Sequence, residues 1–220
     1  MNIDAVILVS FGGPEGMDDV MPFLENVLRG KNVPEERKLQ VFEHYKQFGG
    51  ISPINQQNRA LINALKGEFE ANDIQLPIYF GNRNWHPLLP DTVMKMKNDG
   101  IKNALALVTS AYSSYSGCKQ YRNDIQRATD YVDGEVSIKK IRQYYNHPGF
   151  IEANVDRIRD SITQLPNPGQ GFSVAFTAHS IPVAMAKTSP YEEQLHEVAS
   201  IISDQLKSDV RGLAPLRIIS

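Results

Sequence analysis

The apolar run Ala5–Ser10 reads AVILVS and is followed at once by residues 11–14, FGGP. Short aliphatic runs that stop at glycine and proline are typical of a buried strand followed by a loop. The next segment, residues 17–28, repeats apolar residues at the spacing of one helical face. This order of buried strand, loop and amphipathic helix is the repeating unit of a parallel α/β sheet.

The same alternation continues along the chain. Further strands are predicted at residues 76–80, 104–108, 136–141 and 172–178, and further helices over residues 34–48, 61–69, from 90 onward, 118–125, 148–165 and 191–206. Five strands separated by helices predict an α/β fold whose parallel sheet is covered on both faces.

The second half of the chain indicates a change of domain. We place the boundary after residue 150, so that residues 1–150 form one domain and residues 151–220 begin a second. Residues 212–220 have the pattern of another strand with nothing after it. An unpaired strand at the end of a sheet needs a cover, so this pattern favours a chain that is part of a longer protein.

Composition excludes several classes of protein. The 220 residues include 41% hydrophobic and 22% charged residues and carry a net charge of −2, which gives no reason to expect a nucleic-acid partner. The single cysteine, Cys118, excludes an intramolecular disulfide and any iron–sulfur cluster within this chain. The chain shows no leader pattern and no apolar run of the ~20 residues that a membrane span needs. We therefore predict a cytoplasmic location and no transmembrane segment.

The strand predicted at 172–178 ends on His179, which Pro182 follows closely. In parallel α/β sheets the ligand crevice opens at the carboxyl ends of the strands. A neutral imidazole there can accept a proton near pH 7 or bind a metal ion. A histidine that only caps the following segment explains the pattern equally well, so the residues alone leave both interpretations open.

Other loops carry side chains suited to a ligand. Ser52, in the loop GGISP, is expected to cap the next helix, with a contact to a ligand carboxylate as the alternative. Residues 110–121, SAYSSYSGCKQY, combine hydroxyls and aromatic faces that suit either a large planar ligand or a packed surface loop. Trp85 follows the strand at 76–80 and is expected to form an apolar wall at the same end of the sheet.

Taken in order, these segments resemble the ferrochelatase family, whose members insert ferrous iron into a porphyrin late in heme synthesis. The matching stretches are VILVSFGGP, FLENVLRG, GGISPI, YFGNRNWHP, SAYSSYSGCKQY, YYNHPGFIEA, FTAHSIP and PYEEQLHEVA. They follow one another in the family's order and cover the chain to about residue 205. The resemblance rests on this succession rather than on any one motif.

The resemblance implies two Rossmann-like lobes with parallel sheets and a porphyrin cleft between them, the second lobe being incomplete here. It implies that His179 is the catalytic base and the ligand of the incoming iron. The residues expected to contact the porphyrin are Ser52, Tyr121, Phe11, Tyr45, Arg29 and Trp85. Phe11 stands where some relatives have a tyrosine that ligates the product iron, and a phenylalanine can only form a wall. The pattern is most similar to bacterial members that use coproporphyrin III.

One departure from the family leaves alternatives open. Members are longer and place a catalytic glutamate opposite the histidine, and no carboxylate in residues 1–220 matches its motif. The chain is therefore expected to be a ferrochelatase, an incomplete fragment that at most binds porphyrin, or a related cobalt or nickel chelatase. Porphyrin and Fe²⁺ are the expected substrates, and no tightly bound cofactor is expected.

Overall fold

The computed structural model describes residues 2–114, 119–166, 173–179 and 181–209. The chain divides into two compact units. The first consists of Met1–Thr109 and Tyr121–Ile141, and the second of Ser110–Gln120 and Arg142–Ser220. The domain boundary expected after residue 150 stays a prediction for the complete protein.

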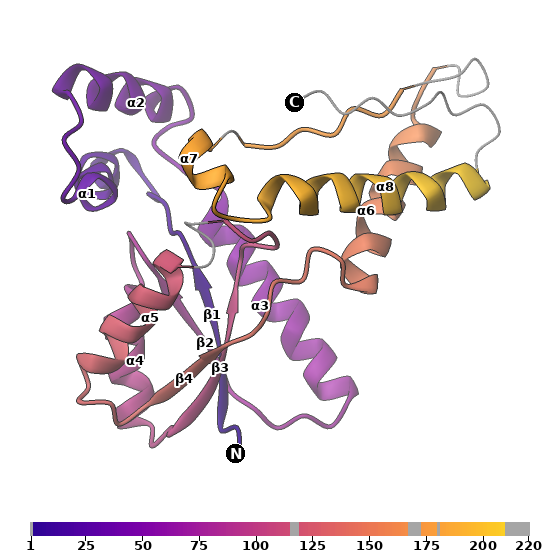
Figure 1. The fold of residues 1–220 in the computed structure, drawn as a ribbon. Coiled ribbons are helices and arrows are strands. Elements are labelled where there is room, and N and C mark those ends of the chain that lie inside the picture. The colour runs from indigo at the N-terminus through magenta and orange to yellow at the C-terminus, as the bar shows by residue number, and fades with distance from the viewer. Residues whose placement is uncertain (1, 115–118, 167–172, 180, 210–220) are drawn as a thin grey trace. The chain divides into compact units, whose positions relative to one another are not determined.

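The first unit is built on a parallel sheet with the strand order β2-β1-β3-β4 (Figure 1). Its strands are β1 Ala5–Ser10, β2 Ile78–Asn82, β3 Asn103–Val108 and β4 Ser137–Lys140. β1 lies between β2 and β3, with Val6 opposite both Ile78 and Leu105. The side chains of β1 are almost all buried, on both faces of the sheet, which explains why the run AVILVS is almost entirely apolar. The α/β fold expected from the sequence is confirmed.

Helices cover both faces of this sheet. α3 lies against one face, and α4 and α5 cover the other, while α1 and α2 lie beyond the carboxyl ends of the strands (Figure 1). The bounds are α1 Met17–Leu28, α2 Glu35–Gln47, α3 Ile54–Ala71, α4 Leu89–Asn98 and α5 Tyr121–Asp130. The helix predicted over residues 17–28 is therefore confirmed at both ends.

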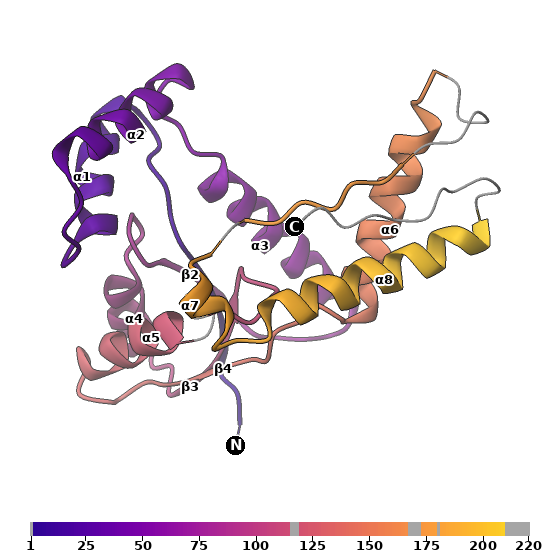
Figure 2. The same cartoon turned by 45° about the horizontal axis from the view of Figure 1, so that its top comes forward.

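The regular secondary structure described in the second unit is helical. Their bounds are α6 Pro148–Thr163, α7 Val183–Ala186 and α8 Tyr191–Asp209. α6 and α8 cross and pack through their apolar faces (Figure 2), burying Ile151, Val155, Val198, Ile202 and Leu206. The helical repeats predicted at 148–165 and 191–206 are thus confirmed. Among the described residues of both units, no helix combines the length and apolar character that crossing a bilayer requires.

The strand predicted at 172–178 is wrong for the described part of it, residues 173–178, which have no regular secondary structure. An apolar run becomes a strand only where a neighbour satisfies its backbone N–H and C=O groups. The strands of the described structure all belong to the first unit, so this run meets no strand partner there. The strand predicted at 212–220 and Cys118 lie outside the described residues.

Two glycine-containing loops meet at the carboxyl end of β1. The backbone N–H of Ser52 donates to the carbonyl of Pro14 at 2.8 Å, and Glu15 pairs with Ile51 in an isolated antiparallel bridge. A Cβ atom on Gly13 would lie 2.5 Å from the Cβ of Ser52. This distance is shorter than any ordinary contact, so only glycine lets the two loops approach this closely.

We expect Gly13→Ala to lower the free energy of unfolding by about 1–3 kcal/mol, because the added methyl group overpacks the contact with Ser52. Gly16→Ala is the matched control, since a Cβ there meets no atom within 4 Å and the backbone is extended. Urea unfolding followed by circular dichroism measures both variants. Equal stability of the two would contradict the close approach of the loops.

Candidate functional site

Four aromatic side chains meet at the carboxyl end of the first unit's sheet. Phe23 of α1 is buried, and the rings of Phe11, Tyr45 and Trp85 pack edge-on against it with centroid distances of 6.2, 6.0 and 6.3 Å. Edge-to-face contacts hold each ring in a defined orientation. This Phe23 aromatic group thus unites three residues predicted to contact substrate, from the loop after β1, from α2 and from the loop after β2.

The loops that carry Phe11 and Trp85 are tied together. The backbone N–H and the side-chain amide of Asn84 both donate to the carbonyl of Phe11, at 3.1 and 3.2 Å. Trp85 Nε1 donates to Asp19 Oδ2 at 3.2 Å. Phe11 nevertheless keeps 38% of its surface exposed. Its ring is therefore both fixed and open to a ligand.

A cavity of about 420 Å³ shares Tyr45 with the Phe23 aromatic group. It is lined by the end of α2 and the GGISP loop: His44, Tyr45, Phe48, Ile51, Ser52 and Pro53. Phe48 and Ile51 leave 74% and 55% of their surfaces exposed. Burial raises the pKa of the Tyr45 phenol, so at neutral pH its hydroxyl keeps its proton and can donate a hydrogen bond. An apolar surface with two hydroxyls suits a large ligand with few polar groups.

The expectation that Ser52 caps the next helix is wrong by one residue. The N-cap position of α3 is Pro53, whose ring sets the backbone angle at the helix entry and offers no side-chain cap. The Ser52 hydroxyl accepts only a long hydrogen bond, of 3.5 Å, from the N–H of Ile54. Ser52 also lines the cavity, where its hydroxyl is able to donate a hydrogen bond.

Tyr121 lies at the start of α5 beside an ion pair. Arg83 Nε is 2.8 Å from Asp124 Oδ2, and the two side chains are only 19% and 9% exposed. The Arg83 guanidinium carbon lies 5.8 Å from the ring centroid of Tyr121. Arg127 forms a second ion pair with Asp124. Because Tyr121 is only 6% exposed, its predicted contact with substrate stays a prediction.

The remaining two predicted residues are exposed. Arg29 directly follows α1, donates to Asn26 Oδ1 at 2.6 Å and does not line the cavity that contains Tyr45. His179 belongs to the second unit, and its carbonyl accepts a hydrogen bond from the Tyr191 hydroxyl at 3.2 Å. The described residues contain no group of three or more His, Cys, Asp or Glu side chains that could hold a metal ion. Iron binding by His179 therefore stays a prediction.

Several residues that shape this site were not predicted from the sequence. Phe23 gave only the signal of an apolar helix face, because its ring partners come from three separate segments. Arg83 directly precedes Asn84 and Trp85 at the end of β2. The strand-end position that singled out Trp85 could therefore have found Arg83 as well, although its partner Asp124 carries no such signal.

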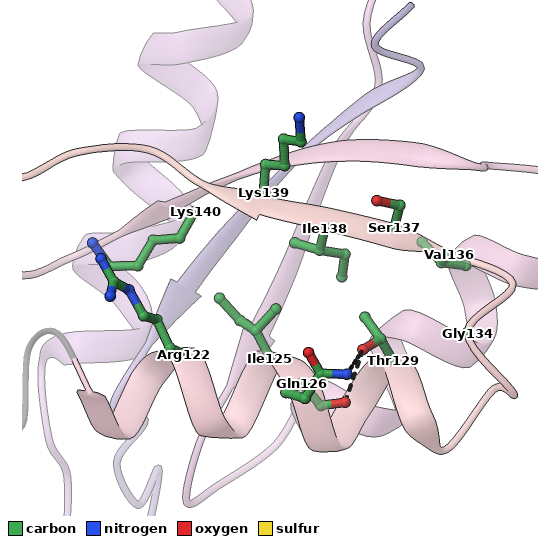
Figure 3. Close-up of a pocket in the computed structure, with 10 residues that line it drawn as sticks. All are labelled: Arg122, Ile125, Gln126, Thr129, Gly134, Val136, Ser137, Ile138, Lys139 and Lys140. Atoms are coloured by element: carbon green, nitrogen blue, oxygen red, sulfur yellow. Dashed lines mark hydrogen bonds between the residues drawn. The ribbon is translucent and has the colours of Figure 1, made fainter. Parts of the chain in front are cut away.

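A larger cavity, of about 600 Å³, lies between α5 and the edge strand β4 of the first unit (Figure 3). Arg122 and Lys140 lie near each other at one end of it, and Ile125 and Ile138 point toward one another across it (Figure 3). None of the predicted site residues lines this cavity. The candidate site is therefore the Phe23 aromatic group with the smaller cavity, where the predicted residues gather.

Comparison with known proteins identifies relatives of this chain. The family model described as ferrochelatase matches residues 3–215. A ferrochelatase of Rhodopirellula baltica is 55% identical over 202 residues, which cover 91% of this chain and 58% of the relative. Coproporphyrin III ferrochelatases of Streptomyces coelicolor and Mycobacterium marinum are each 48% identical, covering 93% and 97% of this chain and 58% and 62% of their own lengths. The chain thus spans about 58% of the length of the first of these relatives.

We expect Asp124→Ala to lower the free energy of unfolding by more than about 1 kcal/mol, because it removes a largely buried carboxylate that forms ion pairs with Arg83 and Arg127. The double variant Arg83→Met with Asp124→Leu removes both charges, and its free energy of unfolding is expected to fall much less. Glu43→Ala, which breaks an exposed ion pair with Lys46, is the control, with an expected change below about 1 kcal/mol. Urea unfolding measures the three variants. An equal loss of unfolding free energy in Asp124→Ala and the double variant would show that breaking this ion pair costs no more than replacing both of its charges.

Proposed function

Because the chain belongs to the ferrochelatase family, we propose that the complete protein inserts Fe²⁺ into a porphyrin, coproporphyrin III, in heme synthesis. The observation that carries the proposal is the Phe23 aromatic group with its adjoining cavity, which offers a flat ligand an apolar surface and two hydroxyls. The relatives from S. coelicolor and M. marinum, named for coproporphyrin III, support the choice of substrate. We further propose that it acts in the reducing cytoplasm, which suits the single cysteine among these 220 residues, and without a tightly bound cofactor.

We assign binding of the macrocycle to residues of the first unit. Phe11, Tyr45 and Trp85 supply aromatic contacts, and Ser52 supplies a hydroxyl for the polar substituents of the ring. Arg29 is exposed and cationic, which suits a propionate. Rings that are already oriented by packing on Phe23 lose little freedom when the porphyrin binds, so more of the contact energy appears as affinity.

We assign proton transfer and metal delivery to His179. Insertion replaces two pyrrole N–H protons by one Fe²⁺, so the iron keeps its oxidation state and two protons leave. A neutral imidazole accepts one proton at a time, and the exposed side chain of His179 can pass it to water. A single imidazole also holds Fe²⁺ weakly enough to release it to four pyrrole nitrogens. The partner glutamate implied by the resemblance stays a prediction, since its motif is absent from these 220 residues.

In the complete protein, His179→Ala is expected to slow Fe²⁺ insertion by about 100-fold or more, because it removes the proton acceptor and the metal ligand together. Porphyrin affinity is expected to stay within about twofold, because the ring contacts are assigned to other residues. Anaerobic assays that follow the loss of porphyrin fluorescence measure the rate. His196→Ala is the control, since His196 is exposed on α8 and faces Glu192 at 3.9 Å. Near-normal insertion by His179→Ala would overturn the assignment.

The same assay separates the alternatives for the wild-type protein. Turnover by residues 1–220 alone at the rate of the complete protein would exclude a fragment that at most binds porphyrin. Faster insertion of Co²⁺ or Ni²⁺ than of Fe²⁺ would favour a related cobalt or nickel chelatase.

Phe11→Ala is expected to weaken porphyrin binding about three- to tenfold, because an exposed ring that packs on Phe23 is lost. Quenching of tryptophan fluorescence on titration with porphyrin measures the affinity, and in residues 1–220 it reports Trp85, the single tryptophan. Leu39→Ala is the control, since Leu39 is 49% exposed on α2 and outside the cavity lining. Equal affinities of the two variants would argue against a porphyrin contact at Phe11.

A further inference from the structure

The N-terminal turn of α8 contacts two segments of the second unit. The hydroxyl of Tyr191 donates to the carbonyl oxygen of His179 at 3.2 Å. Gln194 makes two hydrogen bonds to Ser113: its Oε1 accepts from the backbone N–H at 2.7 Å, and its Nε2 donates to the hydroxyl at 3.0 Å. Residues three apart on a helix share one face, so a single face of α8 holds both segments.

The contact with Ser113 is specific. Gln194 is only 8% exposed, and both ends of its amide bond to the same residue. A buried amide satisfied in this way fixes the position of its partner, because any shift leaves buried polar atoms without hydrogen bonds. Ser113 lies in the SAYSSYS stretch, whose hydroxyls and rings are among the features of the sequence that suit a ligand.

An aromatic contact joins the same two segments. The ring of Tyr112 packs edge-on against the ring of Tyr191, with a centroid distance of 6.1 Å and an interplanar angle of 85°. Tyr191 therefore contacts the 110–114 segment through its ring and His179 through its hydroxyl. Residues 173–179 form no strand ladder in the described part of the chain, so a bond from a helix takes the place of strand pairing next to His179.

We propose that Tyr191 and Gln194 are positioning residues, which hold His179 and the 110–114 segment in a fixed arrangement within the second unit. The proposal rests on the proposed function, because it is the task of His179 in proton transfer that makes its position matter. Neither residue is assigned a contact with the porphyrin or the iron. A displacement of about an ångström at a proton acceptor slows proton transfer without weakening binding of the porphyrin ring. Loss of either positioning residue is therefore expected to lower kcat and to leave KM for porphyrin nearly unchanged.

Tyr191→Phe tests this proposal, because it removes the hydroxyl and keeps the ring against Tyr112. In the complete protein, kcat for Fe²⁺ insertion is expected to fall about three- to tenfold, the loss typical of one neutral hydrogen bond, while KM for porphyrin stays within about twofold. Amide hydrogen exchange of residues 173–179 is expected to become faster. Gln194→Leu is expected to lower kcat by a similar factor. Gln194→Glu keeps the acceptor for the Ser113 N–H, so its kcat is expected to lie between those of Gln194→Leu and the wild type.

Tyr145→Phe is the matched control. The ring of Tyr145 also packs on Tyr112, at 6.3 Å, but its hydroxyl donates to Glu197 Oε2 at 3.2 Å rather than to His179. It is expected to leave kcat and the exchange of 173–179 unchanged. An unchanged kcat in Tyr191→Phe, an equal loss in Tyr145→Phe, or unaltered exchange of 173–179 would each overturn the proposal.

The result that would overturn the proposed function differs from the results that would overturn this positioning role. A wild-type protein that inserts no metal would overturn the assignment as a ferrochelatase. The exchange comparison between Tyr191→Phe and Tyr145→Phe would then still decide whether Tyr191 anchors His179.

Discussion

The candidate site depends on the close approach of two loops, in which Gly13 lies directly against Ser52. The hydrogen bond from the Ser52 N–H to the Pro14 carbonyl fixes the end of β1 relative to the start of α3. On the β1 side this contact sets the place of Phe11, and on the α3 side it sets the hydroxyl of Ser52 in the cavity wall. A side chain larger than hydrogen at position 13 would separate the two halves of the proposed ring-binding surface.

The proposed ring-binding surface combines a buried aromatic side chain with large apolar side chains that are exposed to solvent. Phe23 is buried and orients three rings, whereas Phe48 and Ile51 remain largely exposed at the neighbouring cavity. Large exposed apolar side chains that gather in one place are characteristic of binding surfaces. The second unit supplies a different chemistry, an exposed imidazole whose backbone is held by a helix. Ring binding and proton transfer are thus assigned to separately stabilised parts of the chain.

Local patterns in the sequence were sufficient to predict most strands and helices of the first unit. The run AVILVS and the helical repeat after it predicted β1 and α1 because both signals depend on burial that recurs at a fixed period. The prediction of a strand at 172–178 was wrong in its described part, because a strand needs a neighbouring strand to pair with, and no local pattern reveals one. Phe23 and the pair of Arg83 with Asp124 were missed for a related reason, since their partners lie in segments far away along the chain. Ser52 was predicted to cap α3, but Pro53 occupies the N-cap position, and the contact of Ser52 with substrate stays a prediction.

We propose that this surface binds a porphyrin for metal insertion at His179. A crystal structure of the complete protein with metal-free coproporphyrin III tests it most directly. We expect a macrocycle in contact with Phe11, Tyr45 and Trp85, with the imidazole of His179 facing the pyrrole nitrogens. A porphyrin bound elsewhere, for example in the cavity between α5 and β4, or one whose nitrogens face away from His179, would contradict it.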